Sequence, residues 1–193
     1  MNIRAGIRVV LGLCMLILSA SLLSCSSAAV TSGSFVGQAD GSESFVAIVT
    51  DGDKVMAYIC DSDNIAEWFT AEGIRDTIDL MSADNVGLVA QRGTGDTLDG
   101  TLTQGAGSEF SFSATRVDMD GTLGGLCRAD PRVINGVTYV GGWIVLPDGT
   151  QRGAVVGDNG ERIFGVLIDP ETMIAEVPGL GTFQARVVLP ADL

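Results

Sequence analysis

The chain contains no histidine and a single lysine, Lys54, among its 193 residues. Without histidine it has no Ser-His-Asp or Cys-His catalytic pair, no histidine metal ligand and no histidine pH switch. Eleven Lys and Arg residues stand against 24 Asp and Glu, for a net charge of −13. Nucleic-acid binding needs a clustered basic surface, so this balance argues against a nucleic-acid partner. An apolar fraction of 46% excludes disorder, and the length suits one domain with its own core.

The first 24 residues are predicted to be a lipoprotein signal peptide. Arg4 and Arg8 are the only charges before residue 40, and they precede an apolar run over residues 9–20. A basic end followed by about twelve apolar residues is typical of a secretory signal, whereas a membrane span needs about 20. The sequence Leu22-Leu23-Ser24-Cys25 that follows resembles the lipobox of bacterial lipoproteins.

This resemblance implies cleavage after Ser24 and a diacylglyceryl group, with acyl chains such as palmitate, on the Cys25 sulfur. Two acyl chains are enough for stable membrane anchoring. We therefore expect residues 25–34 to be a lipidated, flexible tether and residues 35–193 to be a β-rich domain at the extracytoplasmic face of the cell membrane. The alternative is an ordinary secretory signal with a cysteine near its cleavage site.

Two cysteines are left once Cys14 departs with the leader and Cys25 is lipidated. They are Cys60 and Cys127. An even pair in an oxidising compartment predicts a disulfide. Two buried free thiols are the alternative, because Cys60 ends an apolar run and Cys127 follows Leu126.

Short apolar runs separated by turn signals predict an all-β fold, an antiparallel barrel or sandwich of about 8–10 strands. Period two places Leu98, Gly100 and Leu102 on one face of a strand, with Phe110, Phe112 and Ala114 on a second strand, and directs Thr101, Thr103, Ser111 and Ser113 the other way. The turn signals are Asp51-Gly52-Asp53, Asn135-Gly136, Pro147-Asp148-Gly149 and Asp158-Asn159-Gly160.

One segment departs from this rhythm and predicts a short helix. Asn64 and Glu67 have capping-box spacing, Gly73 is placed to end the helix, and Ile65, Trp68 and Phe69 form its apolar face. The preceding strands, residues 44–60, are apolar on both faces, so both faces must be covered, by this helix or by closure into a barrel.

Glycine in a strand leaves interior volume unfilled. We therefore expect a small apolar cavity near Trp68 and Trp143 that binds a lipid-like molecule. The alternative is that these aromatic side chains pack in the core.

Four blocks of the chain resemble uncharacterised actinobacterial (mycobacterial-type) cell-envelope lipoproteins. The blocks are residues 55–61, 66–69, 125–129 and 142–151. The resemblance implies secretion and lipid anchoring, and it carries over no catalytic residue. Such chains have an aromatic residue where this one has Cys127.

No motif indicates a metal site or a cofactor. Asp61, Asp63 and Glu72 have EF-hand spacing, but Ile65 and Ala66 stand where a ligand and a glycine are needed. Asp51 and Asp53, and likewise Asp118 and Asp120, are typical of turns.

We expect a non-enzymatic, membrane-anchored cell-envelope lipoprotein that binds an apolar small molecule or a partner protein. One alternative is a hydrolase of envelope glycans or lipids that uses paired carboxylates. Another is a structural or assembly lipoprotein that presents a sheet edge to a partner. Acidic residues clustered at one concave mouth of the folded domain would favour the hydrolase. An enclosed apolar cavity would favour a protein that binds an apolar small molecule. A filled barrel with an exposed sheet edge would favour a module that binds a partner protein.

Overall fold

A computed structural model describes residues 29–105, 107–118 and 124–193. The described chain is all-β, with fifteen strands, one short 3-10 helix and antiparallel pairing throughout, so the predicted fold class is confirmed. The predicted signal peptide and Cys25 lie outside the described residues. Among the residues that are described, no helix has the length and apolar character needed to cross a membrane.

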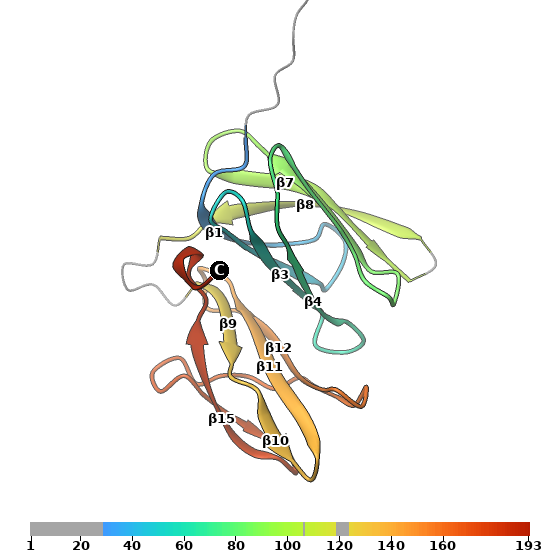
Figure 1. Cartoon of the computed structure of the whole chain (residues 1–193), viewed down its shortest axis with the longest axis vertical. Coiled ribbons are helices and arrows are strands. Elements are labelled where there is room, and N and C mark those ends of the chain that lie inside the picture. Colours follow the sequence, from blue (N-terminus) through green and yellow to red (C-terminus); the bar gives the residue numbers. More distant parts are fainter. Residues whose placement is uncertain (1–28, 106, 119–123) are drawn as a thin grey trace, which may run out of the picture.

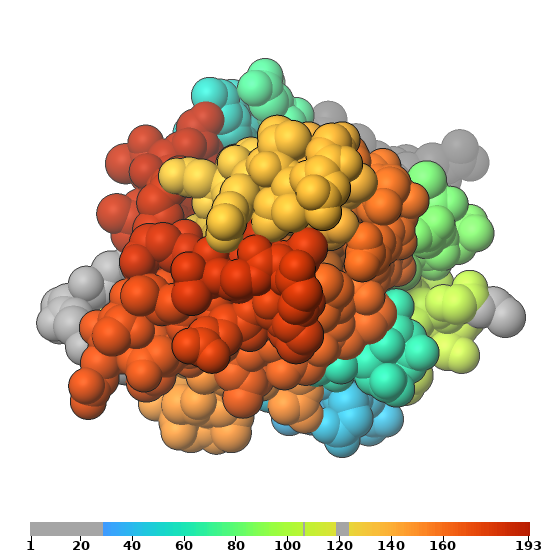
Figure 2. All heavy atoms as spheres, turned by 90° about the horizontal axis from the view of Figure 1, so that it is seen from below, coloured from blue at the N-terminus to red at the C-terminus, as the bar shows by residue number. Residues whose placement is uncertain are grey.

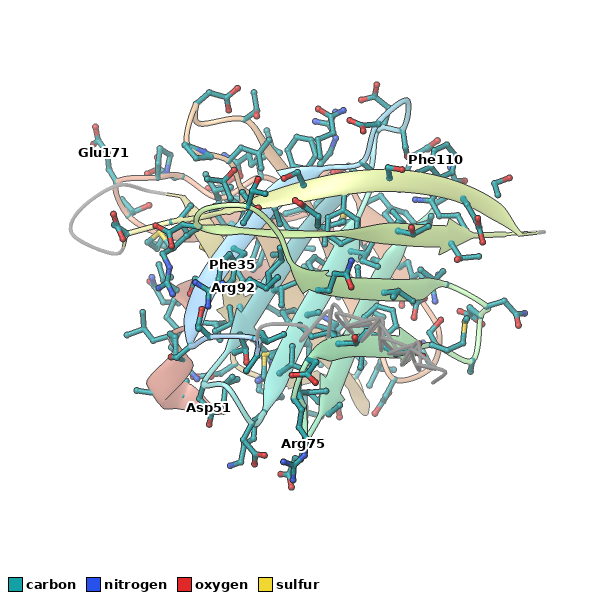
Figure 3. The ribbon with its side chains drawn as sticks, turned by 90° about the horizontal axis from the view of Figure 1, so that it is seen from above. Phe35, Asp51, Arg75, Arg92, Phe110 and Glu171 are labelled. Carbon is teal, nitrogen blue, oxygen red and sulfur yellow. The ribbon has the colours of Figure 1, made fainter. Side chains whose placement is uncertain are left out.

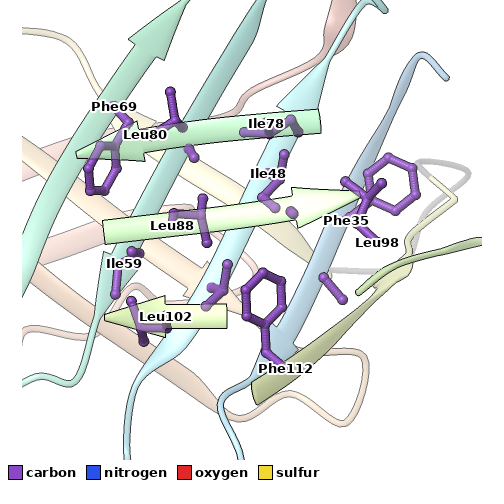
Figure 4. Close-up of a cluster of buried hydrophobic side chains, with 14 of the residues drawn as sticks. Phe35, Ile48, Ile59, Phe69, Ile78, Leu80, Leu88, Leu98, Leu102 and Phe112 are labelled. Carbon is purple, nitrogen blue, oxygen red and sulfur yellow. The ribbon is translucent and has the colours of Figure 1, made fainter. Parts of the chain in front are cut away.

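The first sheet consists of two four-stranded meanders joined side by side through β1 and β8. Its order is β4-β3-β2-β1-β8-β7-β6-β5, and it curls into a nearly closed barrel (Figure 1). Figure 4 shows the strands that carry Ile78, Leu88 and Leu102 crossing steeply over those that carry Ile48 and Ile59. The strands are β1 (Gly33–Gln38), β2 (Phe45–Thr50), β3 (Val55–Cys60), β4 (Ala66–Ala71), β5 (Thr77–Met81), β6 (Gly87–Arg92), β7 (Thr97–Gln104) and β8 (Ser108–Arg116).

The second sheet has the order β13-β12-β11-β9-β15-β14, with β10 paired to one end of β11. It curves into a half-barrel below the first sheet in Figure 1, and its orange and red strands form the near face in Figure 2. Its elements are β9 (Gly125–Ala129), β10 (Arg132–Ile134), β11 (Val137–Val145), β12 (Gln151–Gly157), β13 (Arg162–Phe164), β14 (Ile174–Val177), β15 (Gly181–Val187) and the 3-10 helix η1 (Pro190–Asp192).

Strand alternation divides the apolar side chains into three packed layers. Along β3, Val55, Ala57 and Ile59 point into the barrel, whereas Tyr58 and Cys60 point toward the second sheet. The other face of the second sheet encloses a third cluster. Both apolar faces of residues 44–60 are therefore covered, one by the barrel interior and the other by the second sheet.

The predicted helix after Asn64 is wrong, because residues 66–71 form strand β4. β4 pairs with β3 from Ala66 opposite Cys60 to Ala71 opposite Val55. The Asp61 carboxylate accepts the N–H groups of Asp63, Asn64 and Ile65 at 2.7–2.8 Å, which reverses the chain onto β3. A local capping pattern thus gives way to a side-chain-closed turn and a sheet partner.

The predicted turns and the β7–β8 pairing agree with the structure. Residues 51–53 lie in the turn between β2 and β3, and Asn135 and Gly136 join β10 to β11 with φ of 52° and 85°. Leu98 lies opposite Ala114 and Leu102 opposite Phe110. The folded region begins earlier than the predicted Phe35, since β1 starts at Gly33 and Val30 is buried in the barrel core.

Candidate functional site

The barrel has an open seam between β4 and β5, the two end strands of the first sheet. These strands follow one another in the chain, but no ladder joins them. At one end of the seam lies a pocket of about 410 Å³, which we call the barrel-mouth pocket. Its lining comes from the β3–β4 turn, β4, the β5–β6 turn, the β7–β8 hairpin and β13, and includes Asp61, Glu67, Asp84, Phe110 and Arg162.

The aromatic ring of this pocket comes from β8. In Figure 3, Phe110 lies toward one end of β8. Phe35, which pairs with the other end of β8, lies well apart from Phe110. Phe110 is half-buried and packs against the barrel core, together with Ile65 on the β3–β4 turn. The buried Val86 also lines the pocket, so apolar side chains and charged groups share its lining.

Arg162 binds two carboxylates in the pocket through one nitrogen. Its Nη2 donates to Glu67 Oε1 at 2.7 Å and to Asp84 Oδ2 at 2.6 Å. Glu67 lies on the barrel side of β4, as do Ile65 and Phe69, and its side chain is only 12% exposed. The Asp84 side chain is 61% exposed. The pair Glu67 and Arg162 therefore connects the edge of the barrel to the edge of the second sheet.

Burial and charge act in opposite directions on these groups. Burial raises the pKa of Glu67, and the positive charge of Arg162 offsets part of that rise. Burial alone would lower the pKa of Arg162, but its hydrogen bond to Asp84 and the charge of Glu67 raise it overall. The guanidinium thus stays charged and holds both carboxylates.

The carboxylates of the pocket are poorly arranged for hydrolysis. A glycosidase needs one free acid and one free base or nucleophile beside the scissile bond. Here two of the three carboxylates that line the pocket, Glu67 and Asp84, share Arg162, and the third, Asp61, accepts three backbone N–H groups. No group of three or more potential metal ligands occurs in the described ranges either.

The predicted disulfide between Cys60 and Cys127 is not formed, and both cysteines are buried free thiols. The reason is the alternation of β9. Leu126 faces the barrel in the same cluster as Cys60, so Cys127, one residue later, points to the opposite face of the second sheet. Burial raises the pKa of the Cys60 thiol and raises that of Cys127 to about 12.

Trp68 and Trp143 do not line a shared cavity, because they lie on opposite faces of β11. Trp68 stacks on Tyr58 with ring centroids 4.3 Å apart and covers Gly142, whose added Cβ would lie 2.6 Å from the Trp68 ring. Trp143 is fully buried, and its Nε1 donates to the Val166 carbonyl at 2.9 Å. Neither tryptophan lines the barrel-mouth pocket.

The strand glycines explain why the expected apolar cavity is absent from this place. Each lets an aromatic ring lie against the backbone: Phe112 over Gly100, Trp68 over Gly142, and Trp143 over Gly141 and Gly153. The volume that a missing side chain leaves is therefore filled by a neighbouring ring.

No motif in the sequence marks Arg162 or Asp84 as site residues. The capping-box spacing predicts Glu67 in a helix cap, and the three residues are far apart in the chain. No local spacing signals such a network, because it depends on where the second sheet meets the barrel.

The comparisons with protein families, curated proteins and solved structures found no match to this chain. The resemblance to actinobacterial envelope lipoproteins therefore stays a prediction.

Proposed function

We propose that the protein is a membrane-anchored cell-envelope lipoprotein whose domain is a non-enzymatic binding module for a partner protein. The partner adds an extended segment to the edge of the barrel at β4. The observation that carries this proposal is a filled barrel with an open seam, since a sheet edge is the part of such a fold that can pair with another chain.

The register of the barrel identifies the groups on the β4 edge. Asp61 N–H donates to the Ile65 carbonyl, so these two residues form a hydrogen-bonded pair. Hydrogen-bonded and non-hydrogen-bonded pairs alternate along an antiparallel ladder. Ala66, Trp68 and Thr70 are therefore in non-hydrogen-bonded pairs and direct their main-chain N–H and C=O away from β3. Within the described residues no strand pairs with this side of β4. Thr70 is exposed. Ala66 is buried, so an incoming strand would find accessible unpaired donors and acceptors at Trp68 and Thr70.

The packed interior weighs against an apolar small molecule as the ligand. The barrel core is filled by side chains such as Ile48, Leu88, Leu98 and Phe112, each at most 3% exposed (Figure 4). The half-barrel is likewise filled around Trp143. A lipid-like ligand would have to displace these side chains.

Site-specific photo-crosslinking in the native envelope tests the docking edge. A photoreactive residue at Thr70, on the unpaired edge, should give one discrete cross-linked species. The matched control is Val89, which is 43% exposed but lies on β6, a strand with neighbours on both sides. The same adducts from both positions, or none from Thr70, would contradict the proposal.

Lipid anchoring is tested separately through Cys25. The intact mass of the wild-type protein should include a diacylglyceryl group, and the protein should partition into the detergent phase. Cys25→Ala should abolish both properties. An unmodified Cys25 in the wild-type protein would exclude the lipoprotein assignment and leave the docking edge untouched.

A further inference from the structure

We infer that the barrel-mouth pocket selects an extended partner segment by a lysine or arginine side chain. This inference rests on the proposed docking at β4 and names the chemistry that the seam recognises. It is drawn from three independent features: the unpaired strand edges, the pocket at the end of the seam, and the charge of that pocket.

The second side of the seam also has an unpaired edge. Ser82 N–H donates to the Val86 carbonyl, so Thr77, Asp79 and Met81 direct their main-chain groups away from β6. All three residues are exposed, and the Met81 side chain is 64% exposed. An extended segment that lies along β4 thus faces a second edge, and its alternate side chains point toward the barrel side, where the pocket opens.

The charge of the pocket favours a cationic side chain. Asp61, Glu67 and Asp84 give three negative charges, and Arg162 supplies the one positive charge among the lining residues. Asp61 uses one carboxylate oxygen, Oδ1, for three backbone N–H groups, and its other oxygen has no hydrogen-bond partner in the described part of the chain. The whole chain carries a net charge of −13, which adds long-range attraction for a basic segment.

The shape of the lining fits the rest of a long basic side chain. Ile65, Val86 and Phe110 provide apolar surface against which methylene groups can pack while the cationic end reaches the carboxylates. Arg162 binds one oxygen of Glu67 and one of Asp84 at 2.6–2.7 Å, and the other oxygen of each carboxylate accepts no hydrogen bond from the described residues and can bind the incoming cationic group. A segment with an acidic or short side chain at this point would lack these contacts.

The test uses the full chain in detergent and a fluorescent seven-residue peptide of alternating threonine and valine with a central arginine. Binding is followed by fluorescence anisotropy. We expect saturable binding that weakens about fivefold or more when the central residue is glutamine, and more still when it is glutamate. A double variant, Glu67→Gln with Asp84→Asn, should remove the preference for arginine. Glu109→Gln is the matched control, because Glu109 is exposed on β8 and does not line the pocket.

A second variant separates main-chain pairing from charge. Thr70→Pro removes an outward N–H from β4 and should weaken every peptide, whatever its central residue. Circular dichroism checks that each variant is folded. Equal affinity for the arginine, glutamine and glutamate peptides, or an unchanged arginine preference in the double variant, would overturn the inference. If Thr70 cross-links in the envelope and the peptides show no such preference, the docking edge stands and the basic-side-chain inference alone fails.

Discussion

Arg162 on β13 donates a hydrogen bond to Glu67 on β4 over 2.7 Å, and so joins the edge strands of the two sheets. Both residues lie at the barrel mouth, where β4 leaves the seam open. The same contact therefore stabilises the packing of the half-barrel on the barrel and sets the charge of the candidate binding pocket.

Arg162→Gln should destabilise the fold by about 1–3 kcal/mol, because it leaves the largely buried Glu67 carboxylate without its charged partner. The control is Arg186→Gln, which breaks ion pairs to Asp130 at 3.7 Å and to Asp192 at 3.2 Å, in which the arginine is more than half exposed. That change should stay below about 1 kcal/mol. Urea unfolding of the two variants measures the difference. Equal losses would show that the Glu67–Arg162 contact has no special role in stability.

Stability should depend on pH through Glu67. Burial raises the pKa of Glu67 above the usual value of 4.5, so the folded protein binds the proton of the Glu67 carboxyl group more tightly than the unfolded chain does. The stabilisation is complete below the unfolded pKa and is lost as pH rises through the folded pKa. The free energy of unfolding of the wild type, relative to Glu67→Gln, should therefore decrease as pH rises from below 4.5 toward neutrality. Thermal unfolding across this range checks it, and an increase would reverse the assigned direction.

Gly153→Ala should destabilise the half-barrel by about 1–3 kcal/mol through overpacking. Gly153 lies opposite Trp143 on β11, and an added Cβ would overlap the Trp143 ring and lie 2.6 Å from the Val166 carbonyl oxygen. Gly87→Ala is the control, because its closest contact is the end of the exposed Met81 side chain, 2.8 Å away, which can move. Urea unfolding and tryptophan fluorescence follow both variants. A Gly153→Ala protein as stable as Gly87→Ala would contradict the close packing of Trp143 on this strand.

The thiols of Cys60 and Cys127 should resist modification in the folded protein. Burial raises the pKa of both, that of Cys127 to about 12, so little reactive thiolate forms near neutral pH. Iodoacetamide should leave the native domain unlabelled and should label both thiols after denaturation without a reductant. Intact-mass spectrometry reads the result. Peptide mapping that recovers Cys60 linked to Cys127 would instead restore the disulfide prediction.

Local features of this fold are predictable from the sequence alone. Asn135 and Gly136 adopt positive φ, and Leu98 and Leu102 share one face of β7, because turn conformation and strand alternation depend on neighbouring residues. The apolar residues on both faces of 44–60 likewise require two covered faces. Net charge and composition also restrict the classes of partner, because they do not depend on how the chain folds.

Other features depend on which segments meet in three dimensions. Residues 66–71 have a capping pattern of their own, but pairing with β3 makes them a strand. Cys60 and Cys127 point into different apolar clusters because of the way β9 packs against the barrel. The Glu67–Arg162 contact links residues 95 positions apart, so no local signal encodes it. Burial, charge pairing and the open seam are properties of long-range packing, and the tertiary structure alone decides them.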